Sequence, residues 1–139
     1  YHANGNLKSV GVVVDGKKIG FWKFFHEIGS LHKEGNMVND KEDGYWRIYY
    51  PKGNGYKGKI MWSGLMKNGK ENGVNTYYYP NGNKKYTTTW VNGVSHGTFT
   101  VFDMETGGIR EIGNYVEGKR KGEFKYYDKY GNFQNKIDW

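Results

Sequence analysis

The feature that most constrains this chain is a glycine followed by a short aromatic or β-branched segment, which recurs along its whole length. The glycines are Gly20, Gly44, Gly73, Gly97 and Gly122, so they lie 24, 29, 24 and 25 residues apart. A period of this length is typical of arrays in which every copy is one supersecondary unit. The period predicts a single repeat domain over residues 1–139, divided into a partial repeat 1–20 and the repeats 21–44, 45–73 (with a loop insertion at 51–58), 74–97, 98–122 and 123–139.

Each copy contains the signals of two strands and two tight turns. An aromatic strand reaches a turn such as Ile28-Gly29 or Asn81-Gly82, and a second strand returns to a turn such as Asn68-Gly69. Asn-Gly and related pairs accept the positive φ of a β-hairpin, and aromatic residues favour strands. Asp40 takes the place of the turn glycine once. We therefore predict an all-β fold, an elongated meander of tandem antiparallel β-hairpins.

The turn position also predicts a strand register. If Ile28 and Gly29 are the two central residues of a two-residue turn, Trp22 faces Gly35, and its ring can lie across the bare glycine. The same arithmetic in the repeat 74–97 pairs Asn75 with Thr88, polar with polar. We expect that copy to be the least buried or the most specialised.

Alternation along each strand assigns the two faces of the sheet. Trp22 and Phe24 share the packed face, as do their counterparts in the later copies. The opposite face carries a second aromatic column with basic neighbours. Its members either cover a thin sheet on its second side or contact a partner, because Tyr and Arg are enriched in binding hot spots. The candidate partner-binding residues are Phe25, Arg47, Tyr49, Tyr78, Phe102 and Tyr127, together with the basic cluster Lys119, Arg120 and Lys121.

The net charge of the chain favours some classes of partner but does not identify one. The formal net charge is +7, from 21 Lys and Arg against 14 Asp and Glu. Such a field attracts acidic proteins, anionic lipid headgroups or nucleic acid. The cluster 119–121 is either a solvated turn or a lipid contact. Nucleic acid is disfavoured, because the aromatic residues follow the structural period and packing already explains them.

The sequence leaves the compartment open. There is no cysteine, no apolar run near membrane-spanning length and no signal peptide. We expect a soluble chain, either cytoplasmic or exported after loss of an N-terminal leader. Gly5 aligns with Gly29, which aligns Tyr1 with Phe25, so we expect further residues before Tyr1 in the native chain.

The copies also carry a family pattern. It is clearest in Gly44-Tyr45-Trp46-Arg47-Ile48-Tyr49 and in Gly108-Ile109-Arg110-Glu111-Ile112-Gly113-Asn114-Tyr115. Over nearly the whole chain the pattern resembles the bacterial MORN-variant repeat. The resemblance implies a stack of β-hairpins without a catalytic centre, used for protein or membrane binding, and many bacterial relatives are antitoxin-like. Asn75, Thr88 and the insertion depart from the pattern.

The sequence contains no arrangement typical of an enzyme. The four histidines occupy different places in the repeat, and only His26 and His32 fall near each other, where we expect solvated residues flanking a turn. We therefore predict no catalytic residues, no metal, no cofactor and no small-molecule substrate. The favoured function is a protein-interaction module of the antitoxin or immunity kind, binding an acidic or neutral protein surface. The alternatives are peripheral binding of anionic membrane lipids and a structural spacer in a longer chain.

Overall fold

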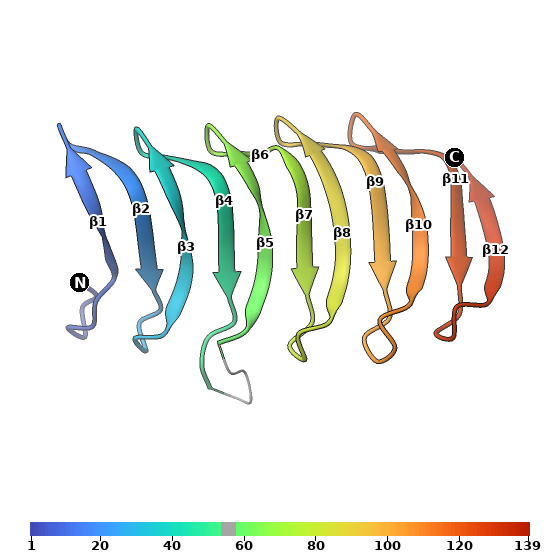
Figure 1. The fold of residues 1–139 in the computed structure, drawn as a ribbon, viewed down its shortest axis with the longest axis horizontal. Helices are drawn as coiled ribbons and strands as arrows, with labels where there is room; N and C mark the ends of the chain where they lie inside the picture. The colour runs from blue at the N-terminus through green and yellow to red at the C-terminus, as the bar shows by residue number, and fades with distance from the viewer. Residues whose placement is uncertain (54–57) are drawn as a thin grey trace.

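The protein is one open antiparallel sheet in which the strands follow one another in chain order, except for one short strand that pairs only with the strand before it. The computed structural model describes residues 1–53 and 58–139. Figure 1 shows the strands side by side in a single row, with the turns alternating between two edges. This confirms the predicted all-β meander of hairpins. The strands are β1 (Ser9–Val14), β2 (Lys17–Phe25), β3 (Leu31–Val38), β4 (Lys41–Tyr49), β5 (Ile60–Lys67), β6 (Lys70–Glu71), β7 (Gly73–Tyr78), β8 (Lys84–Val91), β9 (Val94–Phe102), β10 (Ile109–Val116), β11 (Lys119–Tyr127) and β12 (Phe133–Asp138). The short strand is β6, which pairs only with β5, and β5 pairs directly with β7.

The turns at the upper edge of Figure 1 are two-residue hairpin turns. Both central residues have positive φ, as in Asn68 (φ 50°) and Gly69 (φ 77°). Asp40 adopts the same conformation, with φ 68°. Its carboxylate accepts a hydrogen bond from the backbone N–H of Lys18 at 2.7 Å, and its own N–H donates to the Lys18 carbonyl at 3.1 Å. These two bonds to the preceding hairpin stabilise a non-glycine residue in a conformation that usually favours glycine.

The lower turns differ from the two-residue turn that the sequence suggested. The N–H of Gly29 donates to the His26 carbonyl, and the N–H of His26 donates to the Ser30 carbonyl, both at 2.8 Å. The loop therefore has three residues and ends on Gly29 in the left-handed region. A register shift between Phe24 and Phe25 compensates for the longer loop. For that reason the predicted pairing of Trp22 with Gly35 is still confirmed. Of the predicted insertion at 51–58, residues 54–57 lie outside the described residues.

The two faces of the sheet have different characters. Residues directly opposite on neighbouring strands share a face, so pairing places Trp22, Trp46, Trp62, Phe99 and Phe124 on one side, the tryptophan face. The other side, the polar face, carries the row Lys23, Glu34, Arg47, Ser63, Thr76, Thr87, Thr100, Ile112, Lys125 and Lys136. The buried hydrophobic residues among those described are Trp22, Met37, Trp46, Trp62 and Phe124. The core is therefore a thin layer on the tryptophan face.

The ring that covers a strand glycine such as Gly35 comes from the following strand, whereas the sequence suggested a ring from the preceding strand. A methyl group added to Gly35 would meet the ring of Trp46, from the following strand, and not the ring of Trp22. Trp22 instead covers Gly11, and Phe124 covers Gly113. The indole N–H gives the physical reason, because Trp46 donates it to the Asn36 carbonyl at 3.0 Å, where the β3 to β4 register shifts. Each covering side chain thus lies eleven residues after its glycine and joins one hairpin to the next.

Candidate functional site

Most of the aromatic residues predicted to bind a partner on the polar face have partners within the chain. The Tyr49 hydroxyl donates to the Glu34 carboxylate at 2.6 Å, and Arg47 lies 3.8 Å from the same carboxylate. Burial, followed by this hydrogen bond, raises the pKa of Tyr49 to about 12. The hydroxyl groups of Tyr78 and Ser63 lie 3.4 Å apart. The half-buried ring of Tyr127 packs edge-on against Phe133.

The remaining predicted residues are divided between the two edges of the sheet. Phe25 and Phe102 are half-buried near the lower ends of β2 and β9, where their carbonyls contact the His2 ring nitrogen at 2.8 Å and the Tyr79 hydroxyl at 3.2 Å. Lys119 and Lys121 are exposed at the upper end of β11. The structure therefore does not bring the basic cluster together with the aromatic column.

Arg120 is separated from its two lysine neighbours because its side chain lies on the tryptophan face. Its guanidinium is 3.0 Å from the Glu111 carboxylate and 4.8 Å from the centre of the Phe124 ring. It also donates to the Tyr126 hydroxyl at 3.0 Å. Arg120 therefore has a structural role in its own repeat, whereas Lys119 and Lys121 form no ion pair with the residues that the structure describes.

The tryptophan face is hollowed in the middle of the array. One hollow, the middle groove, has a volume of about 210 Å³. Its walls are Lys33, Glu42, Ile48, Met61, Trp62, Met66, Glu71 and Tyr77. A second hollow of about 230 Å³ is lined by Tyr86, Thr88, Trp90, Ser95, Phe99 and Tyr115. The middle groove is lined by residues of β3 to β7, and the second hollow includes Thr88, where the sequence departs from its own repeat.

Asn75 is the residue that breaks the pattern, and it is fully buried. It occupies the position of Trp46 and Phe124, and its amide lies over Gly64 as their rings lie over Gly35 and Gly113. Of the two expectations for this copy, that it is the least buried is therefore wrong at this residue, and that it is the most specialised stays a prediction. No hydrogen bond of good geometry reaches either amide atom from the described residues, and the same is true of the Trp62 indole N–H. Buried unsatisfied groups cost about 1–3 kcal/mol each, so we expect the departure from the repeat to lower the stability of the fold.

Glu71 lines the middle groove beside Asn75. Burial raises the pKa of Glu71, and the Asn75 amide partly opposes this by favouring the ionised carboxylate. Among residues 1–53 and 58–139 no cation forms an ion pair with it, whereas Glu42 is paired with Lys33 at 2.8 Å. Burial also raises the pKa of the neighbouring Tyr77 to about 12, so that hydroxyl stays neutral. The groove thus combines aromatic and thioether walls with one unpaired carboxylate. Sequence reasoning assigned no role to Glu71.

His26 and His32 are not the solvated residues that the sequence suggested. Their rings are half-buried with centres 4.3 Å apart, and His26 Nε2 is buried without a partner among the described residues. The rings meet because His32 is left unpaired by the register shift at Phe24 and Phe25. Burial, then the His26 ring, lowers the pKa of His32. Across the described ranges, no group of three or more His, Cys, Asp or Glu side chains is placed to hold a metal ion.

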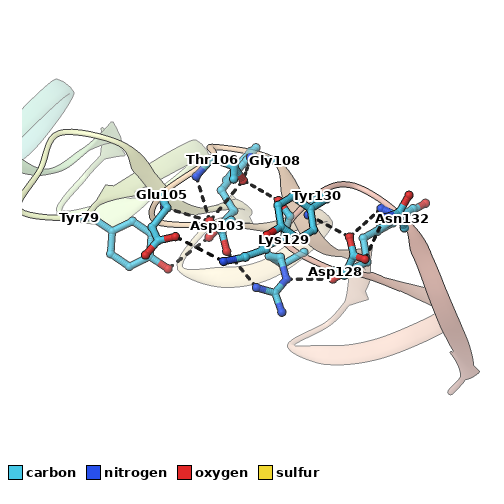
Figure 2. A network of polar contacts seen from close by, with 12 residues as sticks. Tyr79, Asp103, Glu105, Thr106, Gly108, Asp128, Lys129, Tyr130 and Asn132 are labelled. Carbon is cyan, nitrogen blue, oxygen red and sulfur yellow. Dashed lines mark hydrogen bonds and ion pairs between the residues drawn. The ribbon is translucent and has the colours of Figure 1, made fainter.

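A polar network joins the last two lower turns, as Figure 2 shows. Asp103 accepts hydrogen bonds from the backbone N–H groups of Glu105 and Thr106 at 2.9 and 3.0 Å. The Thr106 hydroxyl donates to the Lys129 carbonyl of the next turn at 2.8 Å. The bond from the Thr106 backbone, together with the other donors, lowers the pKa of Asp103 to about 2. Because these groups form hydrogen bonds with one another, we infer that the network stabilises the turns.

Lysines of successive upper turns surround a polar hollow of about 360 Å³. It is lined by Lys41, Lys67, Asn68, Lys70 and Asn92. Three ammonium groups in one place create a local positive field on this edge of the sheet. No helix within residues 1–53 and 58–139 is long and apolar enough to cross a membrane.

Comparison with known proteins adds little to this description. No family model matches the chain, and no curated protein matches its sequence. Among solved structures, the chain is similar to part of the crystal structure of a mutant S. aureus TarM in complex with fondaparinux, alpha-GlcNAc-glycerol and UDP. The similar region covers 82% of this chain and 21% of that one, with 9% sequence identity and a TM-score of 0.47. A likeness this distant carries no functional argument, so function has to be argued from the faces of the sheet.

Proposed function

We propose that the protein is a non-catalytic interaction module that binds a protein partner through the tryptophan face of its middle repeats. The observation that carries the proposal is the middle groove, whose Glu71 carboxylate has no ion-pair partner among the described residues. Beside it, the Trp62 indole N–H and the Asn75 amide are buried without a hydrogen bond of good geometry from those residues. A purely structural array gains stability from regular copies. A copy that departs from the pattern at a cost in stability is the place where we expect selection for binding.

The shape of the sheet also supports binding over catalysis. A single layer of strands presents a long, open face to a partner (Figure 1). Rings on this face contact one another without a break from Trp62 to Phe124, with centres 4.4 to 6.5 Å apart. Aromatic side chains supply large contact area at low entropic cost, and binding hot spots are rich in them. The partner class that we propose is a folded protein with a neutral or acidic surface, since the chain carries +7.

At a finer level, we propose a bacterial protein of the MORN-variant kind with an antitoxin-like or immunity role. This rests on the repeat pattern and on the hairpin array that it predicts. The candidate second function is peripheral binding of anionic lipid. The observation in its favour is the upper edge, where Lys41, Lys67 and Lys70 surround one hollow and Lys119 lies on the same edge.

One experiment separates the two functions. The tagged chain is incubated with native lysate at low and high salt, and with vesicles of neutral or anionic phospholipid. The proposal expects one protein recovered in a fixed ratio that survives high salt, because burial of aromatic surface is little screened by ions. Recovery on anionic vesicles alone, lost at high salt, would reject protein binding in favour of the lipid module. Recovery of neither supports a structural spacer.

A further inference from the structure

Two positions of the repeat, nine residues apart, form an ion pair in the outer copies. In the copy 21–44 the pair is Lys33 and Glu42, with 2.8 Å between ammonium and carboxylate. In the copy 98–122 the same two positions hold Glu111 and Arg120, with the charges reversed and 3.0 Å between the groups. The tryptophan face therefore places one cation and one carboxylate side by side in the copies 21–44 and 98–122, regardless of which position carries which charge.

The cation of each pair also lies over aromatic rings. The Lys33 ammonium is 5.1 Å from the centre of the Phe24 ring and 5.5 Å from that of Trp46. The Arg120 guanidinium is 4.8 Å from the centre of the Phe124 ring. A cation over a ring face is attracted by the ring's electron distribution, and the attraction grows as water is excluded. Each outer copy thus binds its own cation between a carboxylate and a ring.

In the middle copy the same arrangement lacks its cation. The two positions hold Trp62 and Glu71, so the carboxylate is present but its partner is replaced by an aromatic ring. Tyr77 lies beside Trp62, with ring centres 6.5 Å apart. Within the described part of the chain, no Lys or Arg lies over either ring, and none pairs with Glu71. The middle groove is open at this point, with a volume of about 210 Å³.

We propose that the middle groove binds an arginine side chain of the partner protein, with its guanidinium between the Glu71 carboxylate and the rings of Trp62 and Tyr77. The inference rests on the proposed function and names the chemistry of its partner. Charge complementarity selects a cation, because Glu71 is the unpaired member of a pair that the outer copies complete internally. An arginine side chain fits this groove better than a lysine, because a planar, weakly hydrated guanidinium can stack on rings and donate to a carboxylate at the same time. In the copy 98–122 the Arg120 guanidinium lies 3.0 Å from the Glu111 carboxylate and 4.8 Å from the centre of the Phe124 ring.

The test uses a probe that requires no knowledge of the partner. N-acetyl-arginine methylamide is titrated into the ¹⁵N-labelled full chain, and the Trp62 indole signal is followed by NMR. N-acetyl-citrulline methylamide, which has nearly the same shape without the charge, is the matched probe. We expect saturable shifts with the arginine probe, and little change with the citrulline probe. A wild-type chain that shows no shift, or equal shifts with both probes, overturns the inference.

Variants of Glu71 make the test specific to the groove. We expect Glu71→Gln to weaken binding of the arginine probe about tenfold, as loss of one charge-assisted contact does. Glu71→Arg copies Arg120 at the same repeat position, so its own side chain should fill the groove. We expect this variant to lose binding of the arginine probe while its NMR spectrum remains that of a folded protein. Glu105→Gln removes one charge from an exposed turn and should bind as wild type. Equal binding by Glu71→Gln and wild type overturns the inference.

Failure of the inference and failure of the proposed function give different results. If a partner is captured but the arginine probe does not bind, only the arginine assignment is lost. If the probe binds in the groove but no protein is ever captured, the groove chemistry stands and protein binding is rejected.

Discussion

Replacing Gly35 by alanine tests how one hairpin is joined to the next. A Cβ at this position would lie within 3.0 Å of three atoms of the Trp46 ring, closer than real side chains approach one another. Trp46 is 1% exposed, so its ring has little room to move aside. Any movement of the ring also weakens the indole hydrogen bond to the Asn36 carbonyl. The substitution therefore acts on packing and on a hydrogen bond together.

The size of the effect follows from three contributions. Overpacking a core costs about 1–3 kcal/mol, and loss of one hydrogen bond costs about 1 kcal/mol. Alanine in a strand recovers about 0.5–1 kcal/mol relative to glycine. We therefore expect Gly35→Ala to lower the free energy of unfolding by roughly 1–3 kcal/mol, as the sum of these terms.

The assay is urea unfolding followed by tryptophan fluorescence and circular dichroism. Gly113→Ala, which meets the Phe124 ring in the same way, should be destabilising too. Gly108→Ala is the matched control, because a Cβ there has only ordinary contacts, at 3.4 Å or more, and its φ is not left-handed. We expect the control to lie within about 0.5 kcal/mol of wild type. Equal stability of Gly35→Ala and Gly108→Ala would refute the reasoning, because ring cover would then not fix the strand.

Three further substitutions test the account. Asn75→Phe restores the aromatic residue of the repeat and removes an amide without a hydrogen bond of good geometry among the described residues, so we expect urea unfolding to show a gain of about 1–3 kcal/mol. A loss would mean that the contact of the amide with Glu71 stabilises the fold, or that the larger ring overpacks against Trp62. The pKa of Asp103 is lowered from 3.8 to about 2, so its contribution to stability is present above pH 3.8 and is lost as pH falls toward 2. Asp103→Asn should therefore be less stable than wild type at pH 7, and the difference should shrink in acid; a constant difference contradicts this. The pKa of His32 lies below 6.5, so its contribution is present above pH 6.5 and is lost as pH falls. Wild type should lose more stability than His32→Gln between pH 7 and 5 in unfolding experiments, and parallel losses would argue against the buried histidine.

The sequence predicts the repeat and its register because both depend on local signals. Turn pairs such as Asn68-Gly69 need positive φ, and alternation then decides which face each side chain occupies. The length of the lower turns could not be predicted from the register. A three-residue loop with a compensating bulge gives Trp22 the same partner as a two-residue loop. Which ring covers a glycine also depends on a register shift, here the one between β3 and β4. Trp46 donates its indole N–H to the Asn36 carbonyl at that shift, and its ring then lies over Gly35.

The candidate site was harder to predict than the fold. Polar-face residues such as Tyr49 have the right type for recognition, but their hydrogen bonds within the chain become visible only in three dimensions. Glu71 could have been found by aligning the copies, because the opposite charges nine residues apart at Lys33 and Glu42 recur, reversed, at Glu111 and Arg120. The middle copy is the one that keeps a carboxylate and loses its cation.

The most direct test of the account asks which face of the sheet binds the partner. Ser95→Arg places on the tryptophan face the residue that Arg120 has at the same repeat position, and Thr76→Arg places on the polar face the residue that Arg47 has. Both variants add one charge, and both copy a residue that the fold already accommodates. The measurement is the affinity of each variant for the captured partner. Binding lost in Ser95→Arg and kept in Thr76→Arg is the predicted result, and the reverse would contradict the account by placing the interface on the polar face.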